Sequence, residues 1–343
     1  MSKKNRLGIV LVTYGEGKEI KRILDIIQKE KKPGDKVSLI DNHPDYKTAK
    51  VAEKHPAADV VIRSPENSGY VGNNIAAKKI QDEVDLLLFL NPDSMPEPGA
   101  ISKLREGPDD WAGWMGLLVL PDGKINSAGN VIHISGLSWV SAFGQDAAKC
   151  KEPQEVTIMS GADLVIRVSE WLKTEGFGHL YFIYYEDTEL STTMIAMGKK
   201  IGLLPQARIG HNYSFYNSPR KWFLLERNRY IYIIRNWPLG VIVVLLPLLF
   251  IVEIGLWVVA ILQRRFILKM KSTFSFFRLF PATIKSRKNL QKLRKISALE
   301  YFGMLEPRID TPLLPGILRS APVNWFFKGY YSLAKLVLSI FSV

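Results

Sequence analysis

A short acidic run in the middle of the chain has the residue types needed for proton transfer. Glu186, Asp187 and Glu189 follow the aromatic stretch Tyr181–Ile183 at the start of a predicted helix. Acidic residues in a first helical turn are favoured by the helix dipole, so the run alone is typical of a capped helix. A carboxylate that faces a metal-bound diphosphate across a cleft has a second use, as general base for an attacking hydroxyl. The choice between the two depends on the rest of the chain.

A further carboxylate follows a strongly apolar stretch. Asp93 comes after the predicted strand Leu86–Leu90 and the turn-forming pair Asn91-Pro92. We expect its side chain at the edge of a sheet, where a hard divalent cation can be held against a diphosphate. The alternative is a plain turn or helix cap, and the position of Asp93 among the other elements favours the metal site.

The segment 66–74 (ENSGYVGNN) places two glycines and three asparagines at the start of a helix. Backbone N–H groups in such a loop can approach phosphate or ribose oxygens closely. The segment is not a Walker loop, because it lacks the Gly-Lys-Ser/Thr ending, and it is not the dinucleotide-binding fingerprint. The alternative is a helix entry that binds no ligand.

Alternating apolar runs and helical patterns predict the elements that position these residues. Strands and helices in that order form βαβ units with a parallel sheet, and ligands bind beyond the carboxyl ends of its strands. The expected strands are Leu7–Tyr14, Val37–Asp41, Val60–Arg63 and Leu86–Leu90, and the expected helices are Lys18–Lys29, Tyr46–Lys54 and Tyr70–Gln81.

The pattern changes between residues 112 and 166, where shorter apolar segments are broken by Gly, Asn and Pro. Mixed or antiparallel strands are expected there, among them segments 116–121, 130–134 and 156–160. A helix over 187–197 should end at Gly198, and Ile201–Leu204 predicts one more strand. We place the end of a catalytic domain, residues 1–236, just after Arg235.

Residues 237–343 have the composition of a membrane-associated region. Pro238–Leu262 is long and apolar enough to span a bilayer, yet it contains Pro247 and Glu253. Segments 274–296 and 323–343 mix aromatic and basic residues, which is typical of helices that lie in the membrane interface. Because an uncompensated Glu253 at mid-depth is costly, an interfacial arrangement is favoured for the apolar run. A buried core helix is the alternative.

The distribution of charge agrees with a membrane partner. The 343-residue chain has a net charge of +13, and residues 237–343 alone hold 15 Lys and Arg against four Asp and Glu. Because the basic residues share their segment with the most apolar stretch, anionic lipid is favoured over nucleic acid. The single cysteine, Cys150, excludes an intramolecular disulfide framework, and no export signal is apparent at the N-terminus. The catalytic part is therefore expected at the cytoplasmic face of the cell membrane.

Taken together, these residues and the motifs around them resemble those of family 2 glycosyltransferases with a GT-A fold, especially the rhamnosyltransferase-like branch. The resemblance runs from about residue 8 to 297. It rests on motifs in a consistent order: IVLVTYG, LIDN, ENSGYVGNN, LFLNPDS, SGADLVIR, FIYYEDTELS, ARIGHNYS and LLERNRYIYIIRNWP. It implies an α/β, Rossmann-like, mostly parallel sheet with a mixed acceptor-side half, followed by apolar and amphipathic membrane helices.

The resemblance also implies roles for single residues. Asp187 matches the catalytic base, with Glu186 beside it, and Asp93 with His211 matches the metal site. Asp41 would accept from a pyrimidine N3–H, and Glu189 matches a second acid of uncertain role. The donor would further contact Thr13, Tyr14, Asn67, Gly69, Gly72, Asn73, Asn74 and Asn91. The acceptor side would include Gly161, Ala162 and Asp163.

One departure concerns the metal motif, because Asn91-Pro92-Asp93 has a single acid where many relatives have two. The expected reaction is inverting transfer of a sugar from a UDP- or dTDP-linked donor, with Mg²⁺ or Mn²⁺, to a lipid-linked or surface glycan. Two rivals are a nucleotidyltransferase, against which Glu16 argues, and an inactive membrane scaffold with the same fold.

Overall fold

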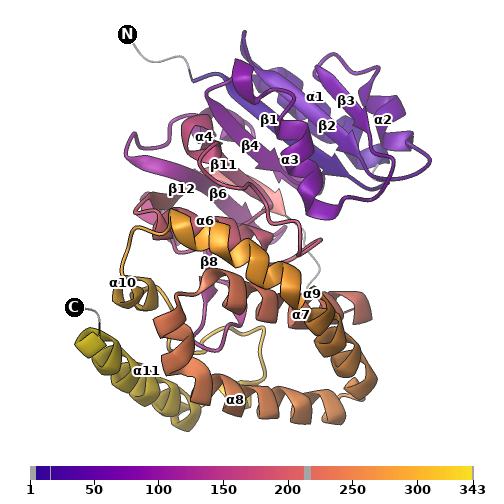
Figure 1. Cartoon of the computed structure of the whole chain (residues 1–343). Helices are drawn as coiled ribbons and strands as arrows, with labels where there is room; N and C mark the ends of the chain where they lie inside the picture. Colours follow the sequence, from indigo (N-terminus) through magenta and orange to yellow (C-terminus); the bar gives the residue numbers. More distant parts are fainter. Residues whose placement is uncertain (1–4, 16, 212–217, 342–343) are drawn as a thin grey trace.

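The structure, a computed structural model, describes residues 5–15, 17–211 and 218–341 (Figure 1). Glu16 and residues 212–217, the first three of which end the ARIGHNYS motif, lie outside the described residues. The strands are β1 (Leu7–Thr13), β2 (Lys36–Asp41), β3 (Val60–Arg63), β4 (Leu86–Leu90), β5 (Ser94–Pro96), β6 (Trp111–Val119), β7 (Ile125–Ser127), β8 (Asn130–Ile132), β9 (Ser138–Val140), β10 (Gln154–Glu155), β11 (Asp163–Arg167) and β12 (Lys200–His211).

One mixed sheet organises the described residues. Its strands follow the order β10-β12-β6-β11-β4-β1-β2-β3, with β5 paired to β12 and β7 paired to β6. The strands β4, β1, β2 and β3 are parallel, whereas β11 runs antiparallel to both β4 and β6. The expected parallel half and mixed half are thereby both confirmed.

The helices before residue 212 surround this sheet. They are α1 (Gly17–Glu30), α2 (Lys47–Ala52), α3 (Gly72–Ala77), α4 (Ala100–Leu104), α5 (Val168–Trp171) and α6 (Glu186–Ala196), with the 3₁₀ turns η1 (Gly69–Val71), η2 (Gln81–Glu83) and η3 (Ala147–Lys149). The helix expected over 70–81 is shorter than predicted. Tight turns donating from Lys79 to the Ala76 carbonyl and from Ile80 to the Ala77 carbonyl end it early.

The middle of the chain differs most from the expected pattern. β6 begins at Trp111 and is buried along its whole length, so it shows no alternation of polar and apolar residues. Segment 156–160 forms only a bridge between Asn130 and Ile158 instead of a strand. β12 continues to His211, well past the expected end at Leu204.

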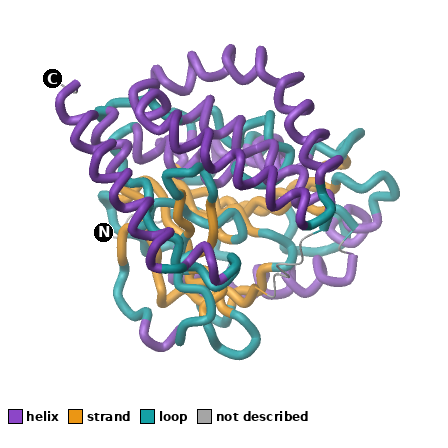
Figure 2. The backbone as a smooth tube through the Cα atoms, turned by 90° about the horizontal axis from the view of Figure 1, so that it is seen from below, coloured by secondary structure: helices purple, strands orange, loops and turns teal. Residues whose placement is uncertain are grey.

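The remaining helices are α7 (Pro219–Asn236), α8 (Leu239–Leu262), α9 (Phe266–Leu293), α10 (Ala298–Gly303) and α11 (Ala321–Phe341), with the turn η4 (Gly316–Arg319). Figure 1 shows α8 along the lower edge of the molecule and α9 returning across it to α7. Figure 2 shows these helices gathered on one side of the strands. α8 is the one described helix that is long and apolar enough to cross a membrane.

The tail helices share a hydrophobic core with the first part of the chain. This second core joins Tyr181 and Tyr185 to Tyr232 in α7 and to Val241 and Leu245 in α8, among others. A separate and larger core surrounds the sheet. The predicted boundary at residue 236 therefore cuts through one continuous core, and it stays a prediction.

Glu253 is compensated, and the expectation that it lacks a partner is wrong. Its carboxylate pairs with Arg229 of α7 and, at 2.8 Å, with the Lys269 ammonium of α9, and it accepts from the Tyr230 hydroxyl. Lys269 also pairs with Glu226. Sequence pattern missed this network because its members lie on three helices that only the tertiary fold brings together.

Candidate active site

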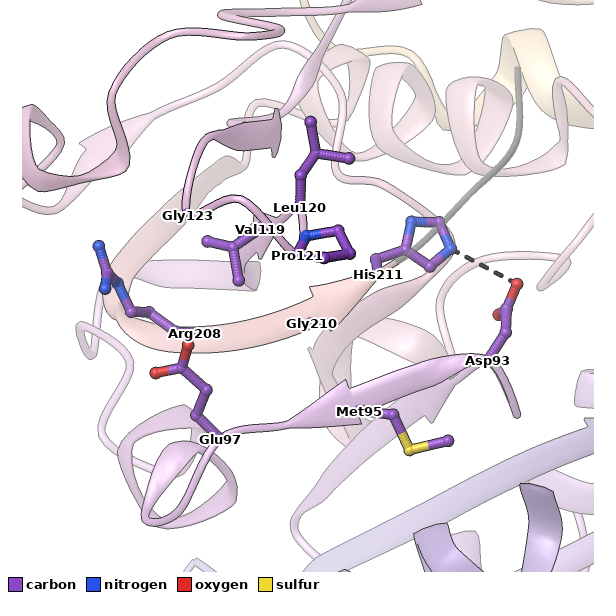
Figure 3. Close-up of a pocket in the computed structure, with 10 residues that line it drawn as sticks. All are labelled: Asp93, Met95, Glu97, Val119, Leu120, Pro121, Gly123, Arg208, Gly210 and His211. Carbon is purple, nitrogen blue, oxygen red and sulfur yellow. Dashed lines mark ion pairs between the residues drawn. The ribbon is translucent and has the colours of Figure 1, made fainter. Parts of the chain in front are cut away.

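Asp93 and His211 lie side by side at the end of the sheet. The antiparallel register of β5 and β12 sets His211 opposite Ser94, the residue after Asp93. The distance from His211 Nε2 to the nearer Asp93 carboxylate oxygen is 3.7 Å (Figure 3). Burial raises the pKa of Asp93, and the hydrogen bond and charge of His211 outweigh burial, so the pKa falls below its usual value.

Asn126 of β7 fixes the orientation of the His211 ring. Its Oδ1 lies 3.2 Å from His211 Nδ1 and accepts from it when Nδ1 is protonated, which directs Nε2 toward Asp93. Nε2 would bind a cation through its lone pair in place of donating to the Asp93 carboxylate. One carboxylate and one imidazole nitrogen fit a divalent cation such as Mn²⁺ or Mg²⁺. Within the described ranges, no group of three or more His, Cys, Asp or Glu side chains is placed to hold a metal. Oxygen ligands from outside the protein would have to complete the coordination.

A cavity of about 380 Å³ opens beside this pair (Figure 3). Asp93 and His211 stand at one end and Arg208 and Glu97 at the other. The cavity is further lined by Met95, Val119, Leu120, Pro121, Gly123 and Gly210. It brings solvent to the candidate metal ligands from the side of β5 and β12.

Glu186 and Asp187 begin α6, after an irregular loop. One Asp187 carboxylate oxygen accepts from the Gly161 N–H at 3.0 Å, and the other accepts from the Thr188 N–H at 2.6 Å. Burial raises the pKa of Asp187 despite these hydrogen bonds. Burial, followed by repulsion from Asp187, raises the pKa of Glu186, whose Oε2 has no hydrogen-bond partner among the described residues. A carboxylate with a raised pKa is a stronger general base.

Tyr70 lies against Gly161, which also borders Asp187, although sequence reasoning did not single out Tyr70. Burial raises the pKa of its phenol, and the negative charges of Glu186, Asp187, Asp163 and Asp93 raise it further. The Tyr70 hydroxyl donates to the Gly161 carbonyl. Its place inside the ENSGYVGNN motif was the available signal. Such a concentration of carboxyls attracts a cation.

The donor loop, residues 67–74, is held by its own asparagines. The Asn67 side chain accepts from the Gly69 N–H at 3.0 Å, and the Asn73 amide donates to the Tyr70 carbonyl at 3.0 Å. Asn74 makes two hydrogen bonds with the backbone of Phe177, each of 2.9 Å. At Gly72 a Cβ would lie 3.1 Å from the Ser68 hydroxyl and 3.2 Å from Ile40, so the loop packs tightly on the sheet.

The predicted nucleotide contacts lie at the ends of β1 and β2. Tyr14 is half exposed and its ring meets His43 edge-on at 4.9 Å, whereas Thr13 is buried. Asp41 is fully buried, and its two oxygens accept from the N–H groups of His43 and Ala49. In this arrangement the Asp41 carboxylate holds the start of α2, and the nucleobase contact stays a prediction.

Asn42, the next residue, contacts the donor loop directly and was not among the predicted site residues. Its Oδ1 accepts from the Ser68 hydroxyl at 2.9 Å, and its amide donates to the Gly69 carbonyl. Polar residues that end a parallel strand were the available signal for Asn42. For Asn126 the sequence offers no comparable signal, because its role depends on the pairing of β7 with β6.

The predicted acceptor-side residues divide into two groups. Gly161 lies against Tyr70 and Asp187, and the Ala162 carbonyl accepts from the Asn91 N–H at 2.9 Å. Asp163 is fully buried, and its carboxylate accepts from the Gly116 N–H at 2.8 Å. Burial raises the pKa of Asp163 well above its usual range. Because the Asp163 side chain is not exposed, the structure offers no surface through which it could contact an acceptor. Its acceptor role stays a prediction.

Glu189 is a structural residue in this arrangement. It accepts from the Tyr181 hydroxyl at 2.5 Å and pairs with Arg235 at 2.9 Å. Both partners are buried. The pair ties α6 to α7, away from the other two acids of the motif.

Comparison with known proteins concerns the family and the fold. Residues 8–169 match the family model for Glycosyl transferase family 2. Rhamnosyltransferase WbbL of Escherichia coli K12 is 23% identical over 243 residues, covering 65% of this chain and 91% of the relative. The N-acetylglucosaminyl-diphospho-decaprenol L-rhamnosyltransferase of Mycobacterium tuberculosis H37Rv is 26% identical over 233 residues, covering 60% and 76%.

A solved structure shows the same fold. GalNAc-T7, crystallised with UDP, GalNAc and Mn²⁺, superposes with a TM-score of 0.55 at 17% identity, over 69% of this chain and 49% of that one. The mostly parallel sheet with its mixed half is a GT-A-like fold. Residues 8–169 thus match glycosyltransferase family 2, and the chain is similar to rhamnosyltransferases of that kind.

Proposed function

We propose that this enzyme transfers a sugar from a UDP- or dTDP-linked donor to a hydroxyl of a lipid-linked or cell-surface glycan, with inversion at the anomeric carbon. The Asp93–His211 pair at the end of the sheet and Asp187, which Gly161 holds next to Tyr70, carry the proposal, because they supply a cation site and a general base. The lipid-linked acceptor is supported by the mycobacterial relative, whose name includes a diphospho-decaprenol substrate.

Each candidate residue then has a defined task. Asp187 takes the proton of the acceptor hydroxyl, and its raised pKa suits that step. Asp93 and His211 hold Mg²⁺ or Mn²⁺, which stabilises charge on the departing diphosphate when bound. The donor loop borders the nucleotide sugar with its backbone N–H groups.

The tail helices form a membrane-binding face in this proposal. Large apolar side chains are exposed on α8, on the first half of α9 and on α11, for example Phe250, Phe274 and Trp325 at 67%, 74% and 71% exposure. Lys271, Arg278, Lys285 and Lys288 are exposed along α9. Apolar burial combined with basic residues fits an anionic bilayer.

An in-plane position of α8 is favoured over a spanning one. Glu253, near its middle, is tied to Arg229 of α7, and Leu245 and Leu248 pack into the second core. A helix fixed in this way along the catalytic half cannot enter a bilayer alone. We further propose, from the composition of the chain, that the active site lies on the cytoplasmic side of the cell membrane.

The reaction is tested with full-length protein, each nucleotide sugar, a lipid-diphosphate-linked glycan and either metal. We expect release of nucleoside diphosphate and a product whose anomeric configuration, read by NMR, is opposite to that of the donor. Release of pyrophosphate would instead support a nucleotidyltransferase, and retained configuration would refute inversion. Absence of both donor hydrolysis and transfer with every donor would support the inactive scaffold.

Membrane binding is tested by flotation with vesicles that contain or lack phosphatidylglycerol. Because the second core joins α8 to the catalytic half, point variants are preferable to truncation at residue 237. Leu246→Gln with Phe250→Gln should reduce flotation, whereas the exposed change Leu172→Gln, just after the end of α5, should not. Full-length protein that stays soluble without detergent and ignores vesicles would refute the membrane face.

A further inference from the structure

The loop that delivers Glu186 and Asp187 to the site has a strained backbone. Phe182, Tyr184 and Tyr185 have φ angles of +70°, +73° and +75°. Residues with large side chains rarely adopt this left-handed conformation, and they keep it only when neighbouring groups impose it. The three residues directly precede the acidic pair, so the position of Asp187 depends on whatever holds this catalytic loop, residues 181–185.

Asn228 of α7 supplies much of that restraint. Its side-chain amide donates to the carbonyls of Tyr181, Ile183 and Tyr184, at 3.1, 2.9 and 2.8 Å. The Asn228 side chain is fully buried, so no water competes for these acceptors. The strained conformation turns three carbonyls of one short loop toward a single side-chain amide.

Arg227 supports the same loop from the preceding position. Its guanidinium donates to the Tyr181 carbonyl at 2.6 Å and also to Asn228 Oδ1 at 2.8 Å. The second contact fixes the orientation of the Asn228 amide, because Oδ1 must face Arg227 and the NH₂ group must face the loop. Asn228 and Arg227 therefore act as one clamp.

The catalytic loop also contacts the donor loop. The Tyr70 N–H of the donor loop donates to the Phe182 carbonyl at 2.7 Å. At Gly69, with φ of +60°, a Cβ would lie 2.3 Å from the same carbonyl, so the two loops touch backbone to backbone. A displaced catalytic loop would misplace Asp187 and loosen one side of the donor loop.

α7 itself is anchored on its neighbours. Arg229, next to Asn228, pairs with Glu253 of α8, and Glu226 pairs with Lys269 of α9. The clamp is thus mounted on a helix that is tied into the tail helices. This arrangement gives Asn228 a fixed base from which to hold the loop.

We propose that Asn228, oriented by Arg227, is a positioning residue for catalysis, because it holds the strained loop 181–185 so that Asp187 faces the acceptor hydroxyl. The catalytic part of this inference rests on the proposed function. The clamp itself does not, because it concerns the conformation of the loop.

The main test is Asn228→Asp, which keeps the side-chain volume and the contact to Arg227 but replaces the donating NH₂ group with an oxygen. We expect kcat to fall by about 30-fold or more while KM for the nucleotide sugar changes by less than about threefold. Asn324→Asp is the matched control. That amide donates to the Ile309 and Arg319 carbonyls, far along the chain from the site, and its loss should leave kcat within about twofold.

Hydrogen exchange followed by mass spectrometry provides a readout that needs no activity. In Asn228→Asp the peptides that contain Tyr70 and residues 181–187 should exchange faster, and in Asn324→Asp they should not. If Asn228→Asp does not fold, Arg227→Met tests the same clamp with a smaller expected fall in kcat and the same local exchange.

Unchanged kcat in the folded variants, or an equal loss in Asn324→Asp, would overturn the positioning role. Unchanged exchange at both peptides would overturn the clamp. Wild-type protein that transfers no sugar would defeat the proposed function, and the exchange comparison would still decide whether Asn228 holds the loop.

Discussion

Replacing Gly161 by alanine tests whether Gly161 packs as closely between Tyr70 and Asp187 as the structure shows. A Cβ at position 161 would lie 2.6 Å from the Tyr70 hydroxyl oxygen and 3.4 Å from the Asp187 Cβ. The second distance is an ordinary contact, whereas the first is far too short. Tyr70 or the backbone at 161 must therefore move by about 0.8 Å to restore normal packing.

That displacement sets the expected magnitude. The Gly161 N–H donates to Asp187, and its carbonyl accepts from Tyr70, so movement of either group disturbs the proposed base. A shift approaching 1 Å in a catalytic group costs on the order of 10- to 100-fold in rate. Overpacking at a buried position should lower the free energy of unfolding by about 1–3 kcal/mol.

The assay measures kcat and KM from nucleoside diphosphate release, together with thermal unfolding. Gly303→Ala in α10 is the matched control, because nothing lies within 4 Å of a Cβ there. It should keep wild-type kcat. Gly161→Ala with kcat within threefold of wild type would refute both the tight packing and the placement of Asp187 at the reacting centre.

Three further predictions concern charged residues. Asp187→Asn should lower kcat on the order of 10²- to 10⁴-fold with nearly unchanged donor binding. In the wild type, kcat/KM should fall toward low pH because the Asp187 carboxyl, whose pKa is raised, becomes protonated. The residual activity of Asp187→Asn should not show this fall. An equal loss of donor affinity would contradict the base assignment. Asp93→Ala should weaken metal and donor binding together in calorimetry, and activity that survives EDTA would argue against the cation site. Glu253→Gln should lower the free energy of unfolding by about 1–3 kcal/mol, since Arg229 is 2% exposed and loses its carboxylate, whereas Glu306→Gln, whose partner Arg308 is exposed, should change it by less than about 0.5 kcal/mol.

Local patterns predicted the parallel half of the sheet well. The apolar runs at β1, β2, β3 and β4 are short, continuous and bounded by polar residues, so their type and order follow from the sequence. The strands in the middle of the chain were harder to predict from the sequence. β6 is buried on both faces and lacks alternation, and the pairing of β12 beyond Leu204 depends on distant strands.

The candidate site shows the same division. Residue type and position after a strand or at a helix start, which are local properties, made Asp93 and Asp187 candidates, and the family resemblance added His211. The surroundings of each residue came only from the fold. Burial of Asp41 and Asp163 follows from the strands packed around them. Asn126 becomes a partner of His211 only because β7 pairs beside β6.

The sequence by itself determined the kind of sheet, the acidic residues at its edge and the apolar, basic tail, because short-range periodicity and composition encode these features. Only the tertiary structure decided that Glu253 has partners, that the tail shares a core with the catalytic half, and that one buried amide at Asn228 holds three carbonyls next to Asp187. These contacts join residues from about 20 to more than 100 positions apart, and no local pattern specifies such pairs.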